Sequence, residues 1–291
     1  MLLMKHYYIF SALCLALISA RAQSTVQENH TIKSRILQQE INYTIYLPEG
    51  YNSSVRDYPV LYLLHGFTDD HTAWIQYGMM QHLTDQAISS GEALEMIVVM
   101  PDADLTWYIN TFDGYRYEDF FIQEFIPYIE RSYRIRAQKA YRAIAGLSMG
   151  GHGSLLYALK YPELFVASAP LSASVRSNEE FIAMSDEQWD NMFALPFGKN
   201  KGKDRITDHL KANTALNIIN QRTAAELSQV RYYIDCGDDD HLIYCNMELH
   251  KALKRKFVDH EFRVRDGGHE WSYWRSALPE VLLFVSASFR K

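Results

Sequence analysis

The segment that most constrains the fold is Gly146-Leu147-Ser148-Met149-Gly150, a G-x-S-x-G sequence between two apolar stretches. Residues 141–145 have the pattern of a buried strand, and residues 154–160 that of a helix. In this context the motif is typical of a nucleophile elbow, a sharp strand-to-helix turn that exposes a serine hydroxyl. The glycines leave room where a β-carbon would collide with neighbouring backbone. The alternative is a glycine-rich turn with an incidental serine.

Short apolar runs alternate with helical patterns along the rest of the chain. The strand-like runs are residues 59–64, 95–100, 141–145, 165–171, 230–235 and 261–265, and the helix-like stretches are 81–90, 120–133, 154–160 and 242–257. Residues 30–47 alternate with period two and predict an antiparallel hairpin at a sheet edge. This order predicts the α/β class, with a mostly parallel central sheet flanked by helices. Pro279 is expected in the first turn of a final helix.

The N-terminus resembles a secretory signal peptide. Lys5 and His6 precede an apolar run over residues 7–20, and Ala20-Arg21-Ala22 supplies small residues at the cleavage-defining positions. We therefore expect a signal peptide over residues 1–22, with an uncleaved anchor as the alternative. Residues 23–291 then form one α/β domain, in which residues 176–229 are a small cap-like insertion. The expected location is secreted or periplasmic, without stable membrane insertion after cleavage.

Charge and cysteine content limit the kinds of partner and cofactor that this chain is expected to bind. The formal net charge is −6 and no basic patch stands out, so nucleic acid is not an expected partner. The spacing of the cysteines shows no metal signature. A disulfide between Cys236 and Cys245 and a pair of buried free thiols both remain open. We expect no metal and no cofactor, and the oligomeric state stays open.

A serine nucleophile needs a neighbouring base, and sites on parallel sheets lie beyond the carboxyl ends of the strands. His269 follows the last strand and a Gly-Gly pair, which fits the chain order Ser…Asp…His of α/β hydrolases. The acid, which would hold His269 in the right tautomer, is expected after the strand at 230–235. Three carboxylates follow this strand, Asp238, Asp239 and Asp240, and they could instead form a solvated turn or a weak cation site.

An oxyanion hole needs two backbone donors aimed at the developing negative charge. We expect one from the N–H of Met149, directly after the nucleophile, and one from the N–H of Phe67, after the strand that ends at His65-Gly66. The side chain of His65 is expected to be structural.

From residue 42 to the C-terminus the chain resembles the esterase D-like α/β hydrolases, which include S-formylglutathione hydrolases, feruloyl esterases, carbohydrate esterases of family one and mycolyltransferases. The matching stretches are Asn42-Tyr-Thr-Ile-Tyr-Leu-Pro48, Leu63-Leu-His-Gly66, Phe121-Ile-Gln-Glu-Phe-Ile-Pro-Tyr-Ile129, Gly146-Leu-Ser-Met-Gly-Gly151, Cys236-Gly-Asp-Asp-Asp-His-Leu242 and Gly267-Gly-His-Glu-Trp271. The resemblance implies the α/β-hydrolase fold. It also favours Asp240 as the acid, since the family's acid falls three residues after a glycine and two before Leu or Phe.

The resemblance and the signal peptide together predict a serine carboxylesterase that cleaves feruloyl or acetyl esters on plant polysaccharide through an acyl-enzyme on Ser148. Alternatives are an acyltransferase to a sugar hydroxyl, a generic short-chain esterase and a non-catalytic binding module. Five aromatic side chains could line a site for an aromatic acyl group or a sugar ring, namely Trp74, Trp107, Tyr108, Phe112 and Trp271. For each of them ordinary packing in the core is the alternative.

Overall fold

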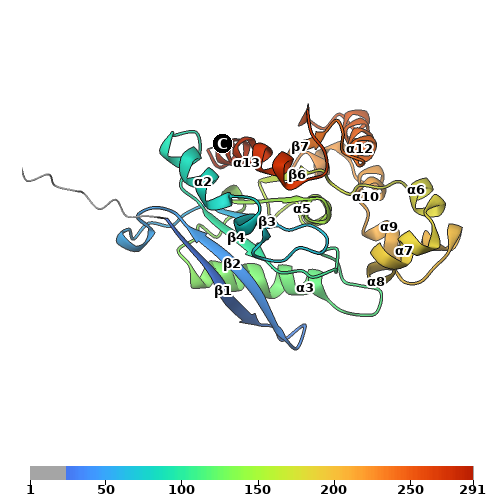
Figure 1. Cartoon of the computed structure of the whole chain (residues 1–291), viewed down its shortest axis with the longest axis horizontal. Helices are drawn as coiled ribbons and strands as arrows, with labels where there is room; N and C mark the ends of the chain where they lie inside the picture. Colours follow the sequence, from blue (N-terminus) through green and yellow to red (C-terminus); the bar gives the residue numbers. More distant parts are fainter. Residues whose placement is uncertain (1–23, 291) are drawn as a thin grey trace, which may run out of the picture.

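The computed structural model describes residues 24–290, so the expected signal peptide over residues 1–22 lies outside the described residues. One sheet of eight strands runs through the molecule (Figure 1). The strands are β1 (Thr25–Lys33), β2 (Glu40–Leu47), β3 (Val60–Leu64), β4 (Ile97–Pro101), β5 (Arg142–Leu147), β6 (Ala167–Leu171), β7 (Arg231–Gly237) and β8 (His260–Arg265). Their order across the sheet is β1-β2-β4-β3-β5-β6-β7-β8.

Only β2 runs against its neighbours. It pairs antiparallel with β1 and with β4, whereas every other neighbouring pair is parallel. The expected hairpin at a sheet edge and the mostly parallel sheet are both confirmed. Every residue of β3, β4, β5 and β6 is buried, because helices cover both faces of the sheet there.

The helices form a layer on each face (Figure 1). They are α1 (Ala73–Gln76), α2 (Met80–Ser89), α3 (Tyr117–Phe120), α4 (Ile126–Ser132), α5 (Met149–Lys160), α6 (Asn178–Ala183), α7 (Asp186–Met192), α8 (Ala194–Phe197), α9 (Asp208–Ala212), α10 (Ala215–Gln221), α11 (Ala224–Leu227), α12 (Ile243–Arg255) and α13 (Trp271–Phe289). Apolar residues of α2 and α13 share one core cluster with the sheet. Residues of α3, α4, α5, α10 and α12 share the cluster on the other face. No helix within residues 24–290 has both the length and the apolar run needed to span a bilayer.

Two proline-containing stretches differ from the expected helices. A π-helical turn, Phe121–Phe125, separates α3 from α4, and Pro127 lies in the first turn of α4, where its missing N–H is not needed. The expectation for Pro279 was wrong, because α13 begins at Trp271 and Pro279 lies in its interior. The apolar face of α13, including Leu278 and Val281, is fully buried against the sheet, and this packing outweighs the lost hydrogen bond.

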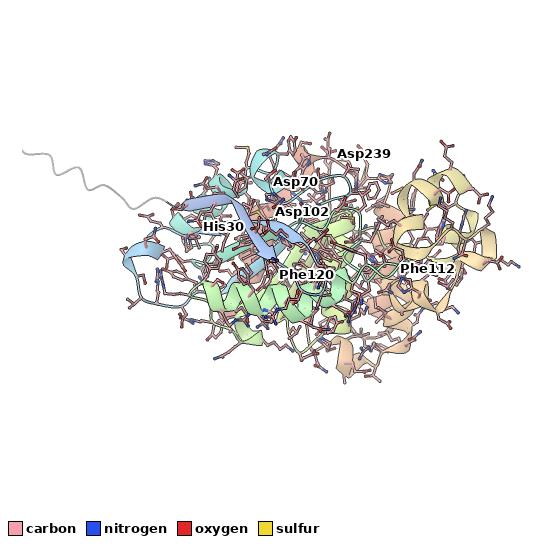
Figure 2. The ribbon with its side chains drawn as sticks, turned by 90° about the horizontal axis from the view of Figure 1, so that it is seen from below. His30, Asp70, Asp102, Phe112, Phe120 and Asp239 are labelled. Carbon is pink, nitrogen blue, oxygen red and sulfur yellow. The ribbon has the colours of Figure 1, made fainter. Side chains whose placement is uncertain are left out.

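The segment 176–229 consists of short helices, α6 to α11, between β6 and β7. Its aromatic side chains Phe181, Trp189, Phe193 and Phe197 pack against one another. The buried guanidinium of Arg205 donates hydrogen bonds to the carbonyls of Phe181 at 2.9 Å and Met184 at 2.6 Å. Figure 2 shows Phe112 beside these helices, where its N–H donates to the carbonyl of Pro196 at 3.0 Å.

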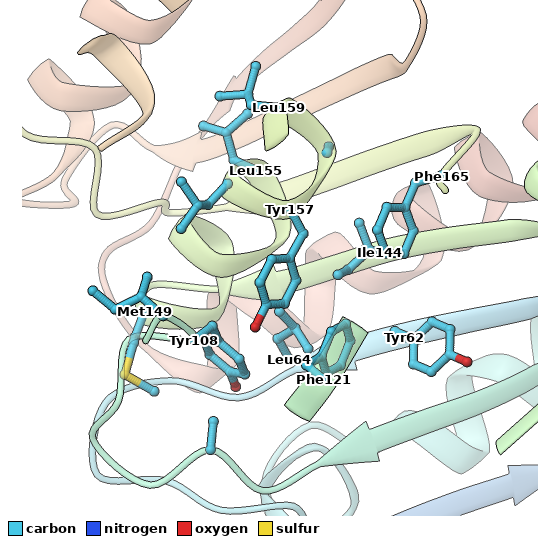
Figure 3. Close-up of a cluster of buried hydrophobic side chains, with 14 of the residues drawn as sticks. Tyr62, Leu64, Tyr108, Phe121, Ile144, Met149, Leu155, Tyr157, Leu159 and Phe165 are labelled. Carbon is cyan, nitrogen blue, oxygen red and sulfur yellow. The ribbon is translucent and has the colours of Figure 1, made fainter. Parts of the chain in front are cut away.

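The helix that follows the elbow is embedded in the core. Figure 3 shows Tyr108 and Met149 near the start of α5. Further along α5, Tyr157 faces Phe121, which belongs to the π-helical turn before α4. The rings of Tyr157 and Phe121 are stacked with their centroids 4.7 Å apart. All residues of α5 from Met149 to Leu159 are buried, so the position of the turn before it is determined by packing on every side.

Both cysteines within the described residues, Cys236 and Cys245, are free and buried. Burial, together with nearby Glu180, raises the pKa of the Cys245 thiol to about 12. The structure therefore favours two structural thiols over the disulfide that the sequence left open.

Candidate active site

Ser148 occupies the turn between β5 and α5 in a conformation that residues with a side chain rarely adopt, with φ 53° and ψ −111°. Its neighbours hold it there through the backbone. Its N–H donates to the carbonyl of Leu171 at 2.9 Å, and its own carbonyl accepts from the N–H of His152 at 3.0 Å and of Ser174 at 3.2 Å.

The glycines of the motif allow backbone segments to approach closely. A β-carbon on Gly146 would lie 2.5 Å from the carbonyl oxygen of Gly150, and one on Gly150 would lie 2.5 Å from that of His65. The second contact also brings the end of β3 against the first turn of α5. The turn therefore requires glycine at both positions for the steric reason expected from the sequence.

Three residues from distant parts of the chain form a continuous hydrogen-bonded chain. The hydroxyl of Ser148 lies 3.0 Å from Nε2 of His269, and Nδ1 of His269 lies 2.8 Å from Oδ2 of Asp240. Ser148 follows β5, Asp240 follows β7 and His269 follows β8, so the carboxyl ends of parallel strands bring them together. Asp238 and Asp239 are exposed instead (Figure 2 labels Asp239).

The carboxylate of Asp240 is buried and fully engaged. Burial alone would raise its pKa, but hydrogen bonds from His269, from the N–H of Leu242 and from the hydroxyl of Ser172 outweigh burial and lower it. The bond from Leu242 measures 2.8 Å. Asp240 is therefore an ionised acceptor at neutral pH, which suits it to orient an imidazole and to stabilise its positive charge.

The imidazole of His269 is also held by two rings. The indole of Trp274 meets it edge-on with centroids 4.9 Å apart, and His241 packs against it at 4.6 Å. Trp274 is itself fixed, because its indole N–H donates to the hydroxyl of Ser172 at 3.0 Å. These contacts restrict the rotation of His269 without using its ring nitrogens.

Of the two expected oxyanion donors, Phe67 lines the same cavity as Ser148, and Met149 directly follows Ser148 in the chain. Within residues 24–290, the N–H groups of Phe67 and Met149 have no hydrogen-bond acceptor. The loop that carries Phe67 is shaped by His65, whose Nδ1 contacts the carbonyl of Gly66 at 2.8 Å and whose Nε2 accepts from the N–H of Ala103 at 2.9 Å. Burial lowers the pKa of His65, which keeps it neutral. His65 thus has the structural position expected for it.

Ser148 lies in a cavity of about 510 Å³. The cavity is lined by Gly66, Phe67, Asp69, Trp107, Leu147, Ser148, Ser174, Arg176, Met192, His241, Leu242, His269, Glu270, Trp271 and Trp274. It joins the sheet edge, the first residues after β6 and the end of α7 from the segment 176–229.

The model of the Esterase family, described as "Putative esterase", matches residues 34–285 of this chain. The chain belongs to this family. A solved ferulic acid esterase superposes on this esterase with a TM-score of 0.78 and 35% identity, covering 91% of this chain and 99% of that one. Together with the sheet order, the similarity identifies the fold as that of the α/β hydrolases and the chain as a carboxylic ester hydrolase.

Curated relatives of the esterase differ in length. An acetyl esterase of Caldicellulosiruptor saccharolyticus is 24% identical over 228 residues, which are 78% of this chain and 82% of the relative. An endo-1,4-beta-xylanase/feruloyl esterase of Xylanibacter ruminicola is 36% identical over 144 residues, which are 47% of this chain and 20% of the relative. The esterase therefore matches only a fifth of the length of that second protein.

The structure corrects three of the expected wall residues. Trp107 and Trp271 line the cavity of the esterase, but Phe112, Trp74 and Tyr108 do not, and Phe112 is exposed. The indole N–H of Trp74 donates to the backbone carbonyl of Leu64 at 3.0 Å. The hydroxyl of Tyr108 donates to the backbone carbonyl of His65 at 3.0 Å. Both side chains are fully buried, and they brace the end of β3 from within the core.

Sequence reasoning missed several lining residues of the esterase. Among them are Met192 and Trp274, which come from helices, and Ser174 and Arg176, which follow β6. A helical aromatic or methionine has no local pattern that separates a cavity wall from the core. For Ser174 and Arg176 the signal is weak but present, because they alternate with the apolar residues Ala173 and Val175.

Two groups of the described residues bring three possible metal-ligand atoms within 4.8 Å of one another. The first is Asp240, His241 and His269, in which Asp240 and His269 already bind each other. The second is Asp238, Asp239 and Asp266, which are exposed carboxylates, and Asp238 accepts the N–H of Gly267 at 3.1 Å.

Proposed function

We propose that this protein is a serine carboxylesterase that works through an acyl-enzyme on Ser148. The observation that carries the proposal is the unbroken hydrogen-bonded chain from the hydroxyl of Ser148 through His269 to the buried carboxylate of Asp240. A serine hydroxyl is a weak nucleophile until a positioned base removes its proton, and this arrangement supplies such a base.

In the first half of the reaction, the hydroxyl oxygen of Ser148 attacks the ester carbonyl while Nε2 of His269 takes its proton. Asp240 accepts the Nδ1–H of the resulting imidazolium and stabilises its charge. The carbonyl oxygen becomes an oxyanion that binds the free N–H groups of Phe67 and Met149. When the tetrahedral intermediate collapses, the carbon–oxygen bond to the alcohol breaks and His269 gives its proton to the departing oxygen.

In the second half, water takes the place of the alcohol. His269 removes a proton from the water as its oxygen attacks the acyl-enzyme, and the same N–H groups hold the second oxyanion. Collapse of this intermediate breaks the bond to Ser148, returns the proton to its oxygen and releases the carboxylic acid. The free enzyme is regenerated without a co-reactant other than water.

For the substrate, we propose feruloyl or acetyl esters that decorate plant polysaccharide. The volume of about 510 Å³ fits a small acyl group with part of its alcohol. Trp107, Phe67 and Trp271 offer ring faces and edges to an aromatic acyl group or a sugar ring. The similarity to a ferulic acid esterase and to an acetyl esterase supports both acyl groups.

Secretion or export to the periplasm belongs to the same proposal and rests on the signal-like sequence of residues 1–22. Expression of the full chain with fractionation of the culture tests it. N-terminal sequencing of exported protein is expected to begin at Gln23. Retention of the intact N-terminus on the membrane would instead indicate an uncleaved anchor.

Turnover of p-nitrophenyl acetate tests the chemical mechanism. The wild-type enzyme is expected to show a burst of p-nitrophenol and to react with a fluorophosphonate probe, and Ser148→Ala abolishes both. Ser53→Ala, a change at an exposed serine remote from the site, is the matched control and retains both. Turnover or labelling that survives in Ser148→Ala would overturn the mechanism.

A second panel tests the substrate. Release of ferulate from feruloyl-arabinose and of acetate from acetylated xylan is compared with hydrolysis of p-nitrophenyl butyrate. Preference for either plant-derived ester supports the proposal, whereas preference for the synthetic ester contradicts it in favour of a short-chain esterase. Acylated sugar formed in the presence of a free oligosaccharide would show an acyltransferase instead.

A further inference from the structure

Two polar side chains face the catalytic cavity without a partner. Within residues 24–290, the hydroxyl of Ser174 and Nε of Arg176 are buried and form no hydrogen bond. The guanidinium of Arg176 also forms no ion pair with any carboxylate among these residues, and it lies 6.0 Å from the centre of the Phe193 ring. A buried donor left unpaired in the free protein costs free energy, which a ligand that accepts from it recovers.

The backbone fixes both side chains relative to the nucleophile. The N–H of Ser174 donates to the carbonyl of Ser148, and the carbonyl of Ala173 accepts from the side-chain amide of Asn246 at 3.0 Å. Ala173 and Val175 are buried in the core, so the alternate residues Ser174 and Arg176 are turned toward the cavity. Neither side chain takes part in the proposed proton transfers.

The distribution of charge determines which group this pair can recognise. Arg176 is the only arginine or lysine among the residues that line the cavity. A second cavity, of about 520 Å³, shares Asp69 with it and has no arginine or lysine in its lining. Its carboxylates are Glu40, Asp69, Asp70, Asp102, Asp104 and Asp113 (Figure 2 labels Asp70 and Asp102). A negative group of a bound molecule is therefore repelled on the Asp69 side and attracted on the Arg176 side.

We propose that Arg176 and Ser174 form a subsite that binds a carboxylate carried by the ester substrate, in addition to the ester group itself. The planar guanidinium matches a carboxylate through two parallel hydrogen bonds, and the serine hydroxyl donates a third. The inference rests on the proposed esterase function and narrows its substrates to esters with an acidic substituent, such as a uronic acid or another hydroxy acid.

The carboxylate can belong to the alcohol or to the acyl group, and matched substrate pairs distinguish the two. For the alcohol side, caffeoyl quinate with its free carboxylate is compared with its quinate methyl ester, following release of caffeate. For the acyl side, 4-nitrophenyl hemiglutarate is compared with 4-nitrophenyl pentanoate. In at least one pair the wild-type enzyme is expected to prefer the acidic member, and added salt weakens this preference.

The variants then test the residues. Arg176→Gln is expected to lower kcat/KM for the preferred acidic ester about tenfold more than for its neutral partner, chiefly through KM, because a charge-assisted pair is lost. Arg176→Lys keeps the charge without the planar fork and is expected to retain part of the preference. Lys203→Gln removes an exposed positive charge from the same segment and is the matched control, with both members of each pair unaffected.

Binding measured without turnover separates this inference from the esterase function. In the Ser148→Ala background, calorimetry with caffeoyl quinate and with 4-nitrophenyl hemiglutarate is expected to show weaker binding of the preferred one after Arg176→Gln. Equal losses for the acidic and neutral members of both pairs, or no preference for either acidic member in the wild type, would overturn the subsite and leave the esterase function standing. Full activity of Ser148→Ala would instead overturn the proposed function.

Discussion

The backbone N–H of Leu242 donates a hydrogen bond to Oδ1 of Asp240 at 2.8 Å and so leaves Oδ2 for His269. The carboxylate is thereby fixed in rotation, and with it the imidazole that it orients. Neither of the preceding aspartates has such a role, since Asp238 and Asp239 are exposed. The structure therefore distinguishes Asp240 from its two acidic neighbours, and substitution of each aspartate can measure the difference in activity.

Replacing the three aspartates one at a time tests this difference. Asp240→Asn is expected to lower kcat for p-nitrophenyl acetate by about a thousandfold or more, because an amide favours the wrong tautomer of His269 and cannot stabilise the imidazolium. Asp238→Asn retains an acceptor for the N–H of Gly267, and both it and Asp239→Asn are expected to stay within about twofold of the wild type. A loss of similar size in all three variants would contradict the assignment.

The close approach of β3 to α5 predicts a stability defect at Gly150. In Gly150→Ala the new methyl group would lie 2.5 Å and 2.6 Å from the carbonyl oxygens of His65 and Leu64, which are backbone atoms that cannot rotate away. The free energy of unfolding in urea is expected to fall by about 3 kcal/mol or more. In the control Gly268→Ala the nearest atom is 3.9 Å away. Equal unfolding midpoints in the two variants would show that the backbone can shift after all.

Trp107 lines the cavity and Trp74 lies in the core, so the same substitution should affect the two positions differently. Trp107→Phe is expected to raise KM for methyl ferulate by about three- to tenfold relative to p-nitrophenyl acetate, because a cavity wall loses ring area. Trp74→Phe leaves the carbonyl of Leu64 without its donor and is expected to reduce the free energy of unfolding by about 1–3 kcal/mol. Steady-state kinetics and urea unfolding measure the two effects. A change in the substrate ratio caused by Trp74→Phe alone would show that Trp74, and not Trp107, contacts the substrate.

Burial of His152 makes stability depend on pH. Burial and the charge of Lys160 lower the pKa of this imidazole to about 4. The unfolded chain takes up a proton near the ordinary histidine value of about 6.5, so the folded state loses stability as the pH falls from that value to about 4. His152→Gln removes this proton uptake. Between pH 7 and pH 4 its free energy of unfolding is expected to fall by about 3 kcal/mol less than that of the wild type.

Urea unfolding at several pH values measures this difference. His82→Gln, at an exposed histidine, is the control and should follow the wild type. Parallel curves of unfolding free energy against pH for the wild type and His152→Gln would contradict the prediction, because they would show that folding leaves the pKa of His152 unchanged.

Much of the architecture could be predicted because its central strands are buried, and a buried strand is recognisable in the local sequence. A strand covered on both faces needs an unbroken apolar run, as in β3 and β4, and the residues that follow such strands meet at one edge of the sheet. For this reason Ser148, His269 and the acidic loop 238–240 could be brought together from chain order, although 121 residues separate Ser148 from His269. The choice of Asp240 within that loop came from the family resemblance.

The aromatic wall could be predicted only in part, and the reason lies in the backbone. Trp107 and Tyr108 are consecutive and both have positive φ, 57° and 61°. Such a turn directs one ring to the cavity and the next to the core, and nothing in two aromatic residues signals a left-handed backbone. The interior position of Pro279 is similar, since tertiary packing of α13 overrides a local preference. Arg176 has only the weak signal of its alternation with apolar neighbours, because its environment comes from the whole cavity.

The backbone of Ser148 has a consequence for how this scaffold changes over evolutionary time. Its φ of 53° with ψ of −111° is disfavoured by a β-carbon, whereas glycine adopts it freely. A lineage that exchanged this serine for glycine would lose its chemistry and gain a more robust fold at a single step. In the proposed mechanism the side chain at this position serves catalysis, whereas the backbone conformation by itself would favour glycine. Inactive descendants that keep the cavity and only bind its ligands are therefore within easy reach of this sequence.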